Sequence, residues 1–127
     1  TTTMGLDMYL TKRRRGSEDD RELVAYWRKA NQIHGWFERN TCDGYIENCE
    51  CYPVCIGDLE CLMADCRLVM EKPGCAPQVL PTTEGFFFGG ASYDDCYFEN
   101  VQATIEQIGR VIADAAEDDE LFYHAWW

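Results

Sequence analysis

Residues 4–10 read MGLDMYL. The apolar side chains of Leu6, Met8 and Leu10 alternate with polar or amphipathic ones, and this period of two is typical of a strand with one buried face. The pattern predicts a strand over residues 5–11. Since a lone strand is not stable, the rest of the chain must supply partners for it.

The last seven residues, LFYHAWW, alternate in the same way and contain aromatic residues that favour strands. They predict a strand over residues 121–127. With helices between the two terminal strands, we expect a small antiparallel sheet in which the first and last strands are neighbours and the helices cover one face.

The first of three expected helices begins at Ser17, whose hydroxyl can cap the helix in a Ser-x-x-acid start. Its predicted core face consists of apolar residues at helical spacing. These are Leu23, Trp27, Ala30, Ile33 and Phe37.

The second helix is expected from Asp58 to just before Pro73, and the third from Ser92, where the Ser-x-x-acid start is repeated. Both carry apolar residues at intervals of three and four. For the second helix these are Leu59, Leu62, Met63, Cys66, Val69 and Met70, and for the third Phe98, Val101, Ile105, Ile108, Ile112 and Ala115.

The segments between these elements are less regular. Residues 40–57 are expected to form a loop with one short strand, and residues 86–88, three phenylalanines between glycines, a short buried strand. The sequence thus predicts a single α+β domain over residues 4–127, with residues 1–3 an expression remnant. The sheet should pack against about three helices.

Charge is unevenly distributed along the 127 residues. Residues 1–40 hold 8 Lys and Arg against 6 Asp and Glu, a net charge of +2. Residues 41–127 hold 3 against 17, a net charge of −14, so the whole chain carries −12. Such a chain should attract basic partners and repel nucleic acid, so we expect no direct nucleic-acid binding. No apolar run approaches a membrane span, and the sequence predicts a soluble, cytoplasmic protein without a membrane partner.

Eight cysteines occur without an export signal, so free thiols are expected. Thiolates can bind zinc, and two spacings invite that interpretation: Cys51-x3-Cys55 and Cys61-x4-Cys66. However, Cys66 belongs to the apolar stripe of the second helix. The sequence therefore favours buried and loop thiols, with no metal and no cofactor.

Familiar catalytic motifs are missing: there is no glycine-rich phosphate loop, no His-Glu-x-x-His and no Gly-x-Ser-x-Gly. Only His34 and His124 could act as imidazole bases, and no carboxylate pair is singled out. We expect no catalytic residues and a protein that is not an enzyme.

A candidate ligand-binding set lies on the first predicted helix: Trp27, Arg28, Asn31 and His34. An indole can stack on a base and a guanidinium can hold phosphate, so this set could bind a nucleotide. The alternative is that Trp27 and His34 are packing residues at the border of the core.

A candidate partner-binding set lies on the third predicted helix: Asp95, Glu99 and Glu106. They are expected on the side away from the apolar seam. A line of carboxylates can occupy a basic nucleic-acid channel, because the same Lys and Arg side chains pair with phosphate or carboxylate. The alternative is an ordinary solvated helix face.

Several stretches together resemble a family of short uncharacterised proteins of bacteria and their phages: MGLDMYL at residues 4–10, YWRKAN at 26–31, IH at 33–34 and WF at 36–37, LPT at 80–82, GFFFG at 85–89, and the aromatic C-terminal end. The resemblance implies a phage or prophage accessory protein that binds and blocks something in the host. The expected function is therefore non-enzymatic inhibition of a basic host protein, such as a CRISPR-type defence component. The alternative is a small-molecule binder that sequesters a nucleotide or a nucleotide signal.

Overall fold

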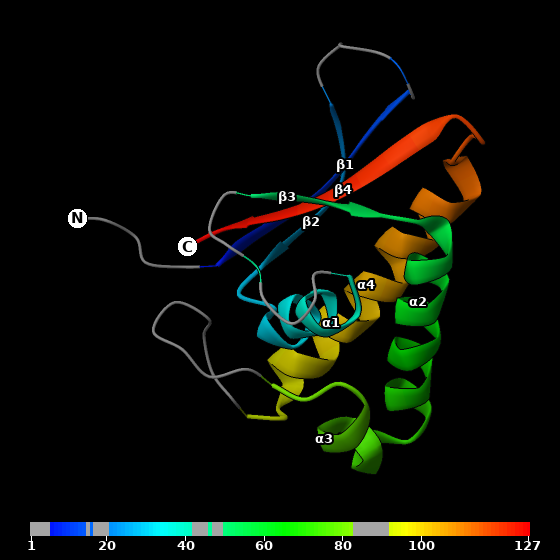
Figure 1. Cartoon of the computed structure of the whole chain (residues 1–127). Coiled ribbons are helices and arrows are strands. Elements are labelled where there is room, and N and C mark those ends of the chain that lie inside the picture. Colours follow the sequence, from blue (N-terminus) through cyan, green and yellow to red (C-terminus); the bar gives the residue numbers. More distant parts are fainter. Residues whose placement is uncertain (1–5, 15, 17–20, 42–45, 47–49, 83–91) are drawn as a thin grey trace.

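The computed structural model describes residues 6–14, 16, 21–41, 46, 50–82 and 92–127. Its elements are labelled in Figure 1. In chain order they are β1 (Asp7–Arg14), β2 (Glu22–Arg28), α1 (Asn31–Thr41), β3 (Cys51–Val54), α2 (Ile56–Glu71), the 3-10 helix η1 (Pro73–Cys75), α3 (Ala76–Val79), α4 (Asp95–Asp114) and β4 (Asp119–Trp126).

The four strands form one antiparallel sheet in the order β2-β1-β4-β3. β1 and β4, the terminal strands, lie side by side at its centre, with Leu10 opposite Tyr123 and Asp7 opposite Trp126. The expected α+β class and the adjacency of the terminal strands are thereby confirmed. The loop over residues 40–57 contains the one short strand expected there, β3.

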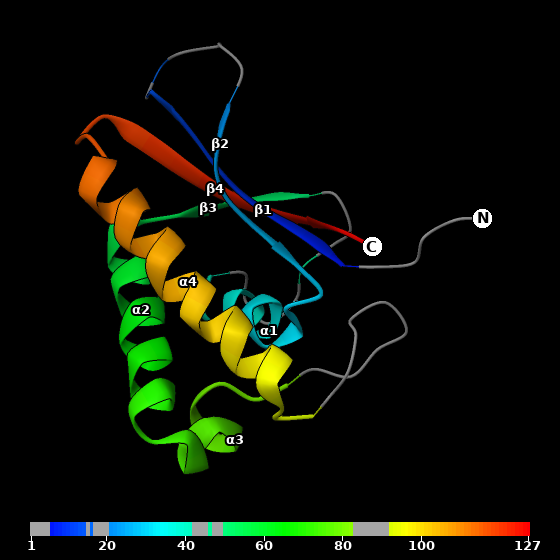
Figure 2. The ribbon, with the colours of Figure 1, turned by 180° about the vertical axis from the view of Figure 1, so that it is seen from behind.

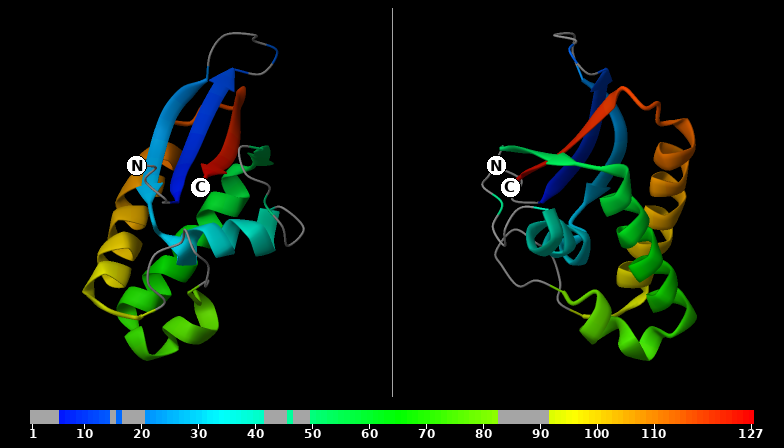
Figure 3. Two further views of the ribbon diagram at one scale, coloured as in Figure 1. Left: turned by 90° about the vertical axis from the view of Figure 1, so that its left-hand side faces the viewer. Right: turned by 45° about the vertical axis from the view of Figure 1, so that its right-hand side comes forward.

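The helices α1, α2 and α4 lie on one side of the sheet (Figure 3). Helices α2 and α4 run antiparallel beside each other, as Figures 1 and 2 show from opposite sides. Helix α1 is enclosed by its neighbours, and its first seven residues, 31–37, are all buried. The exposed residues of α1, Arg39 and Asn40, lie in its last turn, so the polar residues of its first seven positions are part of the core.

The predicted first helix is wrong over residues 22–28, which form strand β2. Ala25 and Trp27 are buried at a period of two, while Tyr26 and Arg28 between and beyond them are exposed. The helical spacing from Trp27 to Phe37 crosses the boundary between this strand and α1. The proposed cap at Ser17 lies outside the described residues.

The other two helices match their predicted extents closely. The side chain of Cys55 caps α2 in a reciprocal capping box with Asp58. Helix α4 is capped by Asp94, whose carboxylate accepts from the Tyr97 N–H at 3.1 Å, and not by Ser92. The predicted strand at residues 86–88 lies outside the described residues.

The buried seam of α4 is shifted from the predicted one by a fraction of a turn. Three of the predicted members, Phe98, Ile105 and Ile112, are only partly buried. The residues that are buried include polar as well as apolar side chains. The buried members are Tyr97, Val101, Thr104, Ile108 and Val111. Among the described residues, no helix has both the length and the hydropathy of a bilayer span.

Candidate functional site

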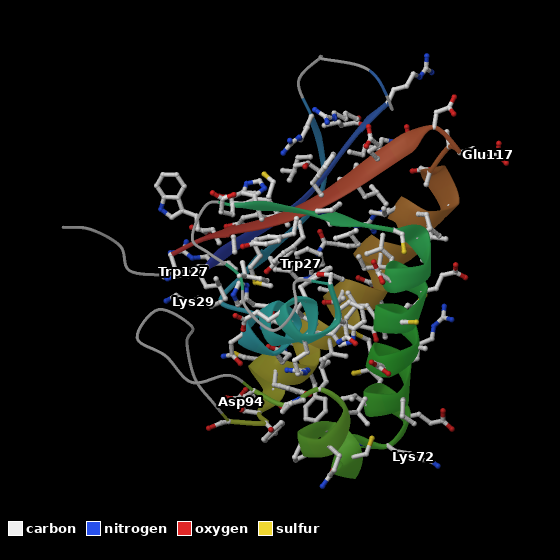
Figure 4. All side chains as sticks on the ribbon, viewed as in Figure 1. Trp27, Lys29, Lys72, Asp94, Glu117 and Trp127 are labelled. Carbon is white, nitrogen blue, oxygen red and sulfur yellow. The ribbon has the colours of Figure 1, made fainter. Side chains whose placement is uncertain are left out.

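A polar pocket lies between the N-terminal ends of α1 and α4. It opens where the chain turns from β2 into α1 at Lys29, which adopts a left-handed backbone conformation with φ 57°. Figure 4 places Lys29 and Asp94, at the starts of the two helices, on the same side of the molecule. The pocket has a volume of about 380 Å³ and is lined by Arg28, Lys29, Asn31, Gln32, Thr82, Ser92, Asp94, Cys96, Tyr97, Glu99 and Asn100.

The predicted ligand-binding set is divided between this pocket and the core. Arg28 and Asn31 line the pocket, whereas Trp27 and His34 do not. Successive residues of a strand point to opposite faces, so Trp27 turns into the core when Arg28 turns out. There the Trp27 Nε1–H donates to Thr104 Oγ1 at 2.8 Å. The helical juxtaposition expected for the four residues does not form.

His34 is completely buried in α1. Its Nδ1 lies 2.7 Å from the Tyr123 hydroxyl, and its ring meets that of Trp127 edge to face. Burial lowers the pKa of His34 from 6.5 to about 4. At neutral pH the imidazole is therefore an uncharged part of the core.

The predicted partner-binding set is exposed along one face of α4. Asp95, Glu99 and Glu106 are separated by four and seven residues, which returns them to nearly the same side of the helix. Glu99 also lines the pocket, so the two predicted sites meet there. Arg110, four residues after Glu106, shares this face, and the sequence analysis had not included it.

The pocket brings together both signs of charge. Arg28 and Lys29 supply cations, Asp94 and Glu99 supply carboxylates, and amides and hydroxyls line the rest. These groups suit the binding of a polar ligand through ion pairs and hydrogen bonds. Sequence reasoning missed Lys29, because nothing in its neighbours signals the left-handed turn that places it there.

The six described cysteines form no disulfide. Cys51, Cys55 and Cys61 are exposed, whereas burial, with a smaller contribution from Asp65, raises the pKa of Cys66 to about 12. In the described part of the chain, no three or more His, Cys, Asp or Glu side chains are grouped so that they could hold a metal ion. The cysteines of the two spacings considered for zinc therefore do not form a cluster of three or more ligands in the described part of the chain.

Fold and site together describe an α+β chain with a polar pocket between two helix N-termini and an acidic helix face beside it. No protein-family model matches this chain, and searches of curated proteins and of solved structures returned no match.

Proposed function

We propose that this chain is a non-enzymatic accessory protein of phage or prophage type that acts in the host cytosol by binding and inhibiting a basic host protein. The expected target class is a bacterial defence component with a nucleic-acid groove, of the CRISPR type. The observation that carries the proposal is the exposed acidic face of α4, formed by Asp95, Glu99 and Glu106.

The dimensions of this face suit a basic groove. Asp95 and Glu106 are eleven residues apart, which is about 16 Å along a helix. Lys and Arg side chains that pair with phosphates form the same charge-assisted hydrogen bonds with carboxylates. Opposite charge also accelerates the encounter of two proteins, and the surface potential of a strongly acidic chain adds to that effect.

The acidic run after α4 contributes less than its sequence suggests. Asp119 lies 3.7 Å from Lys12 Nζ, and Glu120 lies 3.9 Å from Arg13 Nε. Glu117 and Asp118 remain exposed at this end of α4 (Figure 4 labels Glu117). The acidic run therefore adds Glu117 and Asp118, but not the paired Asp119 and Glu120, to the exposed carboxylates beyond α4.

The test is capture of host proteins from a bacterial lysate by the wild-type chain and by the variant Asp95→Lys/Glu99→Lys/Glu106→Lys. A matched control, Glu50→Lys/Glu60→Lys/Glu71→Lys, makes the same change in net charge at three exposed carboxylates away from α4. We expect a basic protein to be captured by wild type and by the control and lost with the α4 variant. Equal capture by all three, or no specific capture, would contradict the proposal.

A second candidate function, small-molecule binding, is favoured by the pocket. Its volume of about 380 Å³ falls in the range of small-ligand sites, and Arg28 and Lys29 could hold a phosphate there. Trp27 and His34 take no part, so a nucleotide would be held by its phosphates and polar edges. Thermal-shift screening with nucleotides and cyclic nucleotides tests this function, with Lys29→Ala as the site variant and Lys72→Ala as the control.

A further inference from the structure

The sheet has a second face, which no helix of the described residues covers (Figure 3, right). Residues that alternate along a strand share a face, and residues paired across strands share it too. Starting from Tyr9, the registers place Tyr26, His124 and Cys51 beside it in one row across all four strands. Adjacent rows contain Phe122 and Trp126. We call this surface the open face.

Three aromatic rings form a row on the open face. Tyr9 and His124 are stacked, with ring centroids 4.7 Å apart and an interplanar angle of 17°. Tyr26 follows on the other side of Tyr9 at 5.4 Å. Tyr26 is 40% exposed and Trp126 is 61% exposed, although both are large and apolar. Exposed aromatic side chains that are grouped on one face, rather than scattered singly, are typical of interaction sites.

Guanidinium groups lie over this layer. Arg21 and Arg13 are both positioned above the ring of Phe122, at 4.3 Å and 5.0 Å from its centroid. Arg21 also donates to the Cys51 sulfur at 2.9 Å and has no carboxylate partner among the described residues. An arginine held on an aromatic ring keeps its charge and its remaining donors available for an anion.

The described residues of the open face carry a different sign of charge from the chain as a whole. Among the described residues, the arginines of this face are Arg13, Arg21 and Arg28, and its carboxylates are Asp7 and Glu120, which pair with Arg28 and Arg13, respectively. This leaves a slight positive excess at one end of a chain whose net charge is −12. The negative charge of the whole chain predicts that the acidic helices repel nucleic acid. The described residues of the open face do not share that negative charge.

Polar atoms within the open face are also unsatisfied. Thr11 Oγ1 and His124 Nδ1 are buried and have no hydrogen-bond partner among the described residues. Thr11 is 8% exposed and pairs with Phe122, directly beneath the arginines. Buried polar groups without partners are rare, and water or a bound ligand commonly satisfies them. A ligand with hydrogen-bonding edges could reach them once the arginine side chains move onto its anionic groups.

We propose that the open face binds single-stranded nucleic acid. Bases would stack on Tyr26, Tyr9 and Trp126, while Arg21 and Arg13 leave Phe122 to contact phosphates. A four-stranded antiparallel sheet with aromatic side chains on its exposed face is a physically suitable platform for splayed bases, since every base has a flat π surface. This inference goes beyond the proposed function and does not depend on it.

Two other occupants fit the observations less well. An acidic protein segment would pair with the arginines but would leave the row of rings without flat partners. A second copy of this chain would bring together two molecules of charge −12, and their mutual repulsion opposes a dimer. Planar bases joined by phosphates match both the rings and the arginines.

The test is fluorescence anisotropy of a labelled twelve-residue oligothymidine with the full chain. We expect a dissociation constant of about 1–100 µM, in the range of non-specific binders. Tyr26→Ala and Trp126→Ala should each weaken binding at least about fivefold, whereas Tyr26→Phe, which keeps the ring, should not. Arg21→Ala should also weaken it, with Arg67→Ala on α2 and Tyr93→Ala before α4 as exposed controls.

Circular dichroism of each variant separates loss of binding from loss of fold. No binding by the wild type, or equal binding by wild type, Tyr26→Ala and Arg21→Ala, would overturn the proposal. Binding of labelled poly-glutamate in place of oligothymidine, with the same dependence on Arg21, would overturn it in favour of an acidic protein partner. The α4 triple variant should bind oligothymidine at least as well as wild type, so this test and that of the host-protein proposal can fail separately.

Discussion

The side-chain amide of Gln107 closes the free edge of the sheet at Tyr26. Gln107 Oε1 accepts from the Tyr26 backbone N–H, and Gln107 Nε2 donates to the Tyr26 carbonyl, both at 2.9 Å. β2 is an edge strand, and exposed strand edges tend to pair with other chains. Gln107 therefore takes the place of a neighbouring strand and ties α4 to the sheet.

Replacing Gln107 by alanine should remove both hydrogen bonds and open this edge. We expect a loss of about 1–3 kcal/mol in the free energy of unfolding, because each bond contributes about 0.5–1.5 kcal/mol. Urea denaturation measures this, and light scattering should detect concentration-dependent association. Gln102→Ala, an exposed glutamine on the same helix, is the control. Identical stability of the two variants would show that the Gln107 pair contributes nothing.

The burial of His34 should make the folded protein less stable in acid. In the unfolded chain its pKa is about 6.5, whereas burial lowers the folded value to about 4, so between these pH values only the unfolded chain takes up the proton. The contribution of the neutral His34 to the free energy of unfolding is fully present above pH 6.5. It is lost as the pH falls toward 4, by up to about 3 kcal/mol. The difference in unfolding free energy between pH 7.5 and pH 4.5 should shrink in His34→Gln. An unchanged difference would place the acid sensitivity elsewhere.

Thiol reactivity should follow burial. Cys51, Cys55, Cys61 and Cys96 are exposed and should react with a maleimide under native conditions, whereas Cys66 should not. The high pKa of Cys66 leaves almost no thiolate, and its burial prevents access. Site-resolved mass spectrometry before and after denaturation measures this. Rapid native labelling of Cys66 would mean that α2 does not pack as described.

Lys29 occupies a backbone conformation that favours glycine. Lys29→Gly should raise the free energy of unfolding, by up to about 1 kcal/mol, because the left-handed conformation is strained for a residue with a Cβ. Lys29→Val should lower it, since a β-branched side chain tolerates that conformation poorly. Thermal unfolding of the two variants gives the comparison. Equal stability of the two variants, or the opposite order, would contradict backbone strain at Lys29.

The sequence predicted the elements whose environment is regular. The terminal strands and the helices α2 and α4 each expose one face, so a period of two or of three and four identifies them. β2 was missed because Trp27 is spaced from Ala30 as in a helix, although the strand ends between them. Periodicity shows that the side chains of Tyr9 and Leu10 lie on opposite faces of the sheet. It does not show which of these two faces the helices cover.

The candidate site was partly predictable for the same reason. Arg28 and Asn31, which were grouped by their chemistry, line the same pocket. His34 was expected at the border of the core but lies in the fully buried first part of α1. The acidic residues of α4 could be placed because an amphipathic helix fixes its outer side. Lys29 and the open face depend on long-range pairing, which no local pattern contains.

The most direct test of the proposed function is the association rate of the captured host protein as a function of salt, measured for wild type and for Asp95→Lys/Glu99→Lys/Glu106→Lys. If the acidic face of α4 guides binding, the wild-type rate should fall by about tenfold or more between 50 and 500 mM salt, roughly the scale of electrostatic steering. The α4 variant should associate slowly at every salt concentration, and Glu50→Lys/Glu60→Lys/Glu71→Lys should stay close to wild type. Equal rates for wild type and the α4 variant, with no dependence on salt, would contradict the account.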